Sequence, residues 1–107
     1  MLDDAVAMAQ AGKQVMVITR HGPWQYFYGH ETDDQILRVY RTAGHERVQY
    51  KSGGTLRFAK TSTAARGWVA DAIYAPMDKL HDTRFNADIM PCLATSIEGS
   101  ITYSTIL

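Results

Sequence analysis

Three polar residues, Arg20, His21 and Gly22, directly follow the apolar run Val17 to Thr19. Arginine can hold a phosphate group through two parallel hydrogen bonds, and histidine can act as a nucleophile in covalent catalysis. A strand that ends in these residues would present both side chains at the edge of a sheet. The stretch therefore raises the question of whether the protein hydrolyses a phosphate ester.

In this feature the chain resembles the opening motif of the histidine phosphatases. That family also needs a second histidine at a strand end, a further arginine for phosphate and an acid for the leaving group. Arg41 lies in a faintly similar context, RTAGHE, but no second His-Gly pair follows a later strand. A small hydrolase built on Arg20-His21-Gly22 is therefore kept as one alternative, and no catalytic residues are predicted.

Residues that bind metals or form disulfides are scattered along the chain. The histidines lie far apart, whereas zinc sites use pairs separated by roughly three to five residues. With the single Cys92, neither a disulfide nor a CxxC zinc site can form within the chain. The sequence predicts no metal site and no cofactor; the residues concerned are His21, His30, His45, His81 and Cys92.

Aromatic rings crowd the segment from His21 to His30, which is also interrupted by Pro23. Such rings can stack on bases, but beside a strand end they more often cover a sheet face or form a contact surface. We expect an ordered loop that serves as an aromatic contact surface, made of Trp24, Tyr26, Phe27 and Tyr28.

Charge is balanced overall but unevenly distributed. The chain has eleven basic and eleven acidic residues, so no global field attracts nucleic acid or membrane. Residues 47–66 contain no acid, and a basic hairpin there could follow a phosphate backbone. A nucleic-acid-binding accessory protein is therefore a second alternative, beside an ordinary solvated hairpin; its basic face would comprise Arg47, Lys51, Arg57, Lys60 and Arg66.

The elements that must position these residues follow from the apolar patterning. Residues 2–11 repeat apolar side chains at helical spacing, and residues 14–19 form a short apolar run typical of a buried strand. Thr32 and Gln35 match a capping box, which predicts a helix over residues 32–43. Residues 46–60 alternate around Ser52-Gly53-Gly54, which predicts a β-hairpin.

The remainder of the chain predicts two strands joined by a helix. Residues 70–75 and 101–107 are the strands, and Asp82 is the expected cap of a helix that Pro91 interrupts. At 107 residues the chain predicts one domain, residues 1–107. We expect an α/β fold of two or three layers, with about three core strands, a β-hairpin and three helices.

The order of motifs in the second half is informative. A glycine turn leads into a strand at residues 55–59, Arg66-Gly67 precedes Asp71, and a helix leads through residues 90–96 into a strand that ends in Tyr103-Ser104-Thr105. This order resembles the ATPase domain of phage large terminase subunits and related P-loop motors. The resemblance implies a P-loop-like fold and a viral, phage-derived protein.

Two departures from that family remove its chemistry. The positions of the family's acidic pair are Pro76 and Met77, neither of which binds a cation or orients water. Upstream there is no GxxxxGK[ST] loop to hold phosphates. We therefore expect a degenerate, terminase-like remnant that does not hydrolyse ATP.

The resemblance implies that the missing phosphate-loop strand leaves residues 14–19, 71–75 and 101–106 as one block of three strands. The last strand would then be an open edge, available to a second copy or a partner. Its interface residues would be Ile101, Tyr103 and Thr105. We therefore favour a non-catalytic protein that acts by binding another protein. It would form a homodimer or modulate a host or phage ATPase. We expect it in the cytoplasm, that of the host if it is phage-encoded, and not in a membrane.

Overall fold

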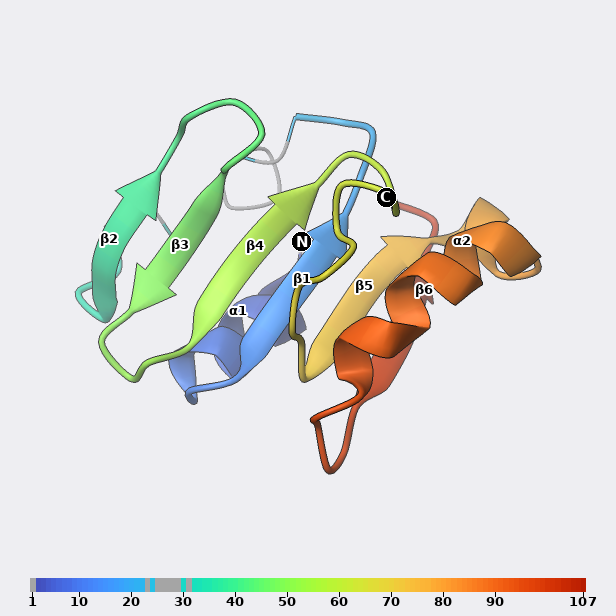
Figure 1. The fold of residues 1–107 in the computed structure, drawn as a ribbon. Helices are drawn as coiled ribbons and strands as arrows, with labels where there is room; N and C mark the ends of the chain where they lie inside the picture. Colours follow the sequence, from blue (N-terminus) through green and yellow to red (C-terminus); the bar gives the residue numbers. More distant parts are fainter. Residues whose placement is uncertain (1, 23, 25–29, 31) are drawn as a thin grey trace.

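The structure is a computed structural model, and it describes residues 2–22, 24, 30 and 32–107. Within these residues six strands form one mixed sheet, in the order β2-β3-β4-β1-β5-β6 (Figure 1). The strands are β1 (Gln14–Ile18), β2 (Ile36–Tyr40), β3 (Arg47–Tyr50), β4 (Thr55–Ala59), β5 (Ala72–Pro76) and β6 (Ser100–Ser104). The helices are α1 (Asp3–Gln10), α2 (Thr83–Ile89) and two short 3-10 helices, η2 (Met77–Lys79) and η3 (Met90–Leu93).

The centre of the sheet is parallel and one side is antiparallel. Strand β1 pairs in parallel with β4 and β5, and β6 pairs in parallel with β5. Strand β3 is antiparallel to β4, and β2 is antiparallel to β3. Strand β1 is buried on both faces, as parallel strands usually are, which explains its nearly continuous apolar sequence.

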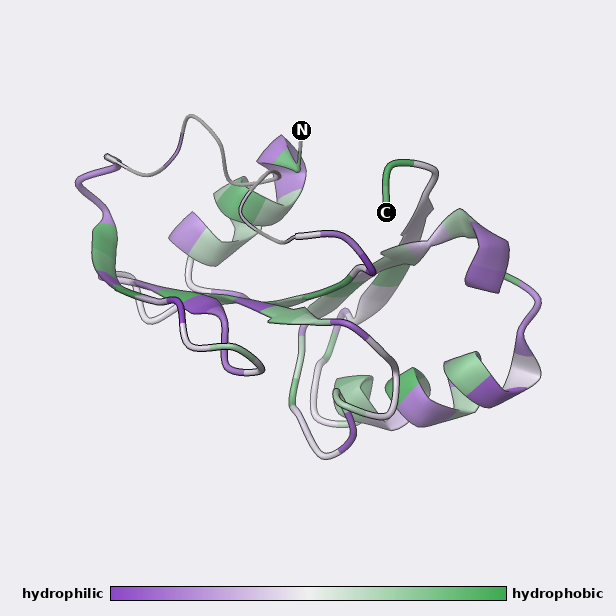
Figure 2. Cartoon of the chain, turned by 90° about the horizontal axis from the view of Figure 1, so that it is seen from above, coloured by the Kyte–Doolittle hydropathy of each residue, from purple (hydrophilic) through white to green (hydrophobic). Residues whose placement is uncertain are grey.

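A helix covers each face of the sheet, so the sheet is the middle of three layers (Figure 2). Helix α1 packs on one face with Val15, Val17 and Leu56, and α2 packs on the other with Met16 and Ile73. The predicted α/β class is therefore confirmed, whereas the described residues contain two α-helices where three were expected. Among the described residues no helix is long and apolar enough to cross a membrane.

Helix α2 begins where its sequence predicts. The Asp82 carboxylate accepts a hydrogen bond of 2.9 Å from the backbone N–H of Phe85, so it caps the first turn. Phe85 and Ile89 point from the helix into the core, and Pro91 lies in the first turn of η3. The helix is only seven residues long, so its stability depends on the cap and on this packing.

Asp82→Ala is expected to lower the free energy of unfolding by about 1 kcal/mol, the usual cost of losing such a cap. Urea denaturation measures this difference. Glu98→Ala is a suitable control, because Glu98 is an exposed acid in the turn before β6. Equal stability of the Asp82 variant and the control would contradict the role of the cap.

The helix predicted over residues 32–43 is wrong, because residues 36–40 form strand β2. The pairing of β2 with β3 shifts register between Ile36 and Arg38, which indicates a β-bulge. The bulge places both Ile36 and Val39 against the α1 side of the core, although residues three apart in a regular strand face opposite sides. Their spacing of three therefore imitates a helical pattern.

The capping box also has another explanation in the structure. The side chain of Asp33 accepts a hydrogen bond of 2.8 Å from the backbone N–H of Gln35, forming a local turn before β2. The β-branched and aromatic residues of β2 then favour an extended chain.

The hairpin around Ser52-Gly53-Gly54 is confirmed as strands β3 and β4. It does not stand apart from the core strands, because β4 also pairs with β1 from Gln14 and Thr55 onward. The turn lies against the end of α1, where the Ser52 hydroxyl donates a hydrogen bond of 3.0 Å to the Ala9 carbonyl. The hairpin is therefore an integral part of the sheet.

The three strands expected to form one block do so, in the order β1-β5-β6 with β6 at the edge. Strand β6 ends earlier than expected, at Ser104. Thr105 and Ile106 form a turn, and Leu107 returns to the core on the α1 side.

Tyr50 carries an uncompensated polar group inside the core. The Tyr50 side chain is 1% exposed, and its hydroxyl has no hydrogen-bond partner. Among the described residues it is the one buried side-chain oxygen or nitrogen in this position. Burial, together with the charge of Asp33, raises the pKa of Tyr50 to about 12. An unsatisfied buried hydroxyl destabilises the folded state.

Tyr50→Phe is expected to raise the free energy of unfolding at neutral pH by about 1 kcal/mol. The folded protein keeps the Tyr50 proton up to a higher pH than the unfolded chain, so stability falls as pH rises from about 10 to 12. The Phe variant should show a shallower fall, measured by urea denaturation across this range. Tyr40→Phe should instead lose stability, because it removes a hydrogen bond to Gln49. Lower stability of the Tyr50 variant would contradict the prediction.

Candidate nucleic-acid interface

Half of one face of the sheet has no helix over it among the described residues. Helix α2 lies in front of β5 and β6, whereas no described helix lies in front of β2, β3 and β4 (Figure 1). Side chains alternate along each strand, so those that do not enter the core beneath α1 emerge on this uncovered side. They are largely polar or charged: Arg38, Tyr40, Arg47, Gln49, Thr55 and Arg57.

Burial alternates along β3 and β4, and this alternation places their polar side chains on the uncovered side of the sheet. Val48 and Tyr50 are buried, whereas Arg47 and Gln49 between them are half-buried. Strand β4 behaves in the same way, with Leu56 buried beside Arg57. Packing against α1 thus fixes the direction of the arginines.

Arg47 and Arg57 lie directly opposite one another on β3 and β4. Like charges in this position destabilise a pair of strands. Burial, and then the charge of Arg47, lower the pKa of Arg57. The folded protein therefore holds two guanidinium groups together at an electrostatic cost.

Aromatic rings hold the arginines in place. The guanidinium carbon of Arg47 lies 3.9 Å from the ring centroid of Tyr40, and that of Arg38 lies 4.9 Å from the same centroid. Arg57 lies 3.8 Å from the ring centroid of Trp68, which comes from the connection between β4 and β5. We call Arg38, Tyr40, Arg47, Arg57 and Trp68 the arginine-aromatic face.

Within the described part of the chain, no carboxylate forms an ion pair with an arginine of this face. Other arginines are paired: Arg20 with Asp78 at 2.8 Å, and Arg66 with Asp88 at 3.7 Å. The positive charge of the arginine-aromatic face is therefore not compensated by an ion pair among these residues.

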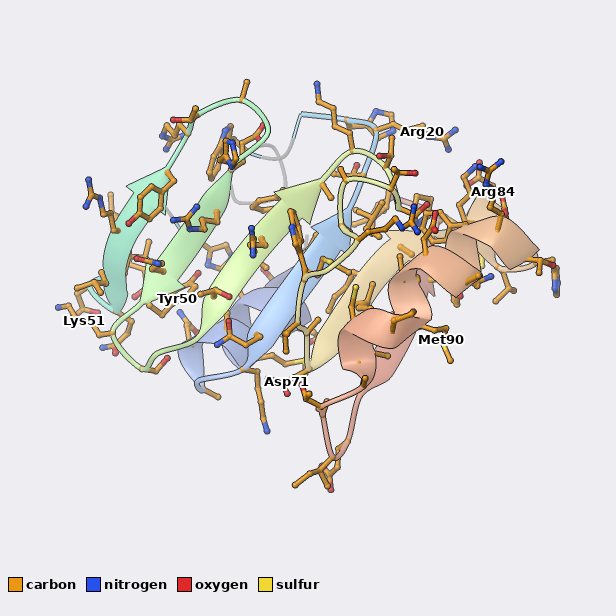
Figure 3. The ribbon with its side chains drawn as sticks, viewed as in Figure 1. Arg20, Tyr50, Lys51, Asp71, Arg84 and Met90 are labelled. Carbon is orange, nitrogen blue, oxygen red and sulfur yellow. The ribbon has the colours of Figure 1, made fainter. Side chains whose placement is uncertain are left out.

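The five basic residues singled out in the sequence do not form one surface. Arg47 and Arg57 are neighbours, but Lys51 lies in the turn after β3. This turn is at the opposite end of the sheet from Arg20, which follows β1 (Figure 3). Lys60 follows β4 at the same end as Arg20, and Arg66 faces Asp88. The structure adds residues that the sequence analysis missed: Arg38, Tyr40 and Trp68.

Trp24 from the expected aromatic loop is a packing residue. Its ring meets Phe58 edge to face, with centroids 5.6 Å apart, on the α1 side of the core. Arg41 lies over the same ring at 4.4 Å. Tyr26, Phe27 and Tyr28 lie outside the described residues.

Arg20 and His21 are at the end of β1, as expected from the sequence. Arg20 is ion-paired with Asp78, which follows β5, and the backbone N–H of His21 donates to the Thr19 hydroxyl at 3.2 Å. Asp78 is a strand-end acid that the sequence analysis missed, just beyond Pro76 and Met77. No cluster of three metal-binding side chains occurs in the described residues.

Asp71 has a structural contact at the other end of the sheet (Figure 3). Its carboxylate accepts a hydrogen bond of 2.8 Å from the backbone N–H of Gln14, the first residue of β1. It thereby joins the starts of β1 and β5.

At the edge strand β6, the backbone is more available to a partner than the predicted interface side chains are. Ile101 and Tyr103 pack toward the core beneath α2, and the Tyr103 hydroxyl donates a hydrogen bond to the side-chain oxygen of Asn86. Thr105 lies in the turn beyond β6 and is exposed. A partner at this edge would therefore pair with the backbone of β6.

Comparison with known proteins returns no match: no family model, curated protein or solved structure is similar to the chain.

Proposed function

We propose that this protein is a non-catalytic domain that binds single-stranded nucleic acid on the arginine-aromatic face. Guanidinium groups bind phosphate oxygens through paired hydrogen bonds, and aromatic rings and guanidinium planes stack on bases. Tyr40 and Trp68 lie beside the arginines, so both kinds of contact are available on one surface.

The observation that carries the proposal is the pairing of Arg47 with Arg57 across β3 and β4. Two opposed cations without a carboxylate raise the energy of the free protein. A phosphate placed between them would neutralise both charges and release the counterions of the strand. A nucleic acid backbone supplies such phosphates at regular intervals.

A single strand fits this surface better than a duplex. A flat sheet face does not enter a groove, whereas unpaired bases can lie on rings and guanidinium planes. The contacts are to phosphate and to the faces of bases, so we expect weak dependence on sequence.

Fluorescence anisotropy with a labelled oligothymidylate tests the proposal. Three phosphate contacts, one from each arginine of the face, predict a slope of about −2 when log affinity is plotted against log salt. A duplex of the same length should bind more weakly. Absence of binding at low salt, or preference for the duplex, would contradict the proposal.

The open edge of β6 favours a second function, the binding of a protein strand. Strand β6 contains neither lysine nor proline, whereas the opposite edge, β2, has a bulge and Arg38. We propose this edge as the site for a partner or a second copy, in keeping with descent from a phage P-loop motor. Such a domain would modulate a host or phage ATPase without catalysis.

Thr102→Lys tests this second function. Thr102 is exposed on β6 and lies near Asp3 and Asp4, so the new charge should not unfold the protein. A dimer seen by sedimentation in the unmodified protein should dissociate in the variant, because lysine on an edge opposes pairing. A monomer in both proteins excludes the homodimer, and an unchanged dimer excludes β6 as its interface.

A further inference from the structure

A pocket of about 400 Å³ opens where β1 and β4 end. Its walls come from the ends of these strands, from the turn between β2 and β3, and from the connection that follows β4. The lining includes Ala43, Glu46, Phe58, Lys60, Ala64 and Trp68.

The pocket lies at a reversal in the path of the chain. Trp24, which follows β1, packs on the α1 face, whereas Ala65 and Ala70, which follow β4, are buried on the opposite face. Strands β1 and β4 are parallel neighbours. In open sheets, ligands bind in the crevice between neighbouring strands whose connections leave on opposite faces.

Trp68 connects the pocket to the arginine-aromatic face. It lines the pocket and also holds the guanidinium of Arg57 at 3.8 Å from its ring centroid. A strand that contacts Arg57 with a phosphate would therefore bring its neighbouring nucleotide to the mouth of the pocket.

The chemistry of the lining suits a base. Phe58 and Ala59 are buried apolar residues of the lining, and pockets of this volume enclose small organic ligands. The carboxylate of Glu46 can accept a hydrogen bond from a ring N–H such as N3–H of thymine, and the ammonium group of Lys60 can donate to a carbonyl or a phosphate.

We propose that the pocket holds one unstacked base of the bound strand while Arg57 and Lys60 contact phosphates beside it. This inference rests on the proposed function. It adds that the protein turns one base of the strand out of its stack. A free mononucleotide presents the same chemistry, so the experiment includes it as a separate ligand.

Affinities for three ligands test the inference: an oligothymidylate, an abasic strand of the same length, and thymidine monophosphate. Ala64→Leu fills the pocket from the connection after β4. It should lower the affinity for the oligothymidylate about tenfold, the effect of one stacked base, and leave the affinity for the abasic strand unchanged. Thr63→Leu is the control, because Thr63 is exposed and outside the lining.

A second variant, Ala43→Leu, fills the pocket from the turn between β2 and β3 and should have the same effect, which guards against misfolding of the first. Unchanged affinity for the oligothymidylate in both folded variants would overturn the base pocket while leaving the proposed function intact. If thymidine monophosphate binds as tightly as the oligothymidylate, the inference that the pocket holds a base of a bound strand is wrong. Absence of binding by either strand at low salt would contradict the proposed function itself.

Discussion

Replacing Arg47 and Arg57 together by glutamate is expected to lower the affinity for an oligothymidylate by more than about 100-fold. Each charged hydrogen bond to phosphate contributes about 1.5–3 kcal/mol, and the new carboxylates would repel the strand. Both arginines are half-buried on a sheet surface, so the variant should fold. Its two carboxylates would again oppose one another on β3 and β4, so no gain in stability is expected.

The matched control reverses Lys13 and Lys51, which are exposed and lie at the ends where β1 begins and β3 finishes. It changes net charge by the same amount and should retain most of the affinity. Replacing both arginines by glutamine should reduce the salt slope from about −2 to about −0.7, because two phosphate contacts are lost. An equal loss of affinity in the lysine control would show that net charge, and not this face, determines binding.

Gly54→Ala is expected to destabilise the protein by about 3 kcal/mol or more. A Cβ atom at this position would lie 1.9 Å from the Ala9 carbonyl oxygen and 2.9 Å from that of Lys13. Both contacts are backbone atoms, so the hairpin turn would have to move away from α1. That movement would also break the hydrogen bond from Ser52 to Ala9.

Gly53→Ala is the control for this variant. Gly53 has a φ of +92° and nothing within 4 Å of an added Cβ, so its substitution costs backbone strain of about 1 kcal/mol without a collision. Urea denaturation compares the two variants. A Gly54 variant no less stable than the Gly53 variant would contradict the close contact between the turn and α1.

The sequence predicts those parts of the fold that depend on local pattern. The apolar run of β1, the alternation in β3 and β4, and the cap at Asp82 each arise within a few residues. Strand β2 could not be predicted in this way, since its bulge places Ile36 and Val39 on one side and imitates a helix. A local pattern cannot reveal a bulge that is formed by pairing with another strand.

The candidate site was only partly predictable. The acid-free stretch indicated Arg47 and Arg57, but their direct opposition depends on the register of β3 and β4. Arg38 and Tyr40 required β2 to be recognised as a strand. Trp68 reaches Arg57 through a connection whose path follows from the parallel pairing of β4, β1 and β5.

The most direct measurement of the central claim is a titration of the isotope-labelled protein with an oligothymidylate, followed by backbone amide NMR shifts. The account predicts salt-dependent shifts concentrated in β2, β3, β4 and at Trp68, with the indole N–H of Trp68 among the largest. Shifts concentrated in β5 and β6, or none at low salt, would contradict a nucleic-acid interface on the arginine-aromatic face.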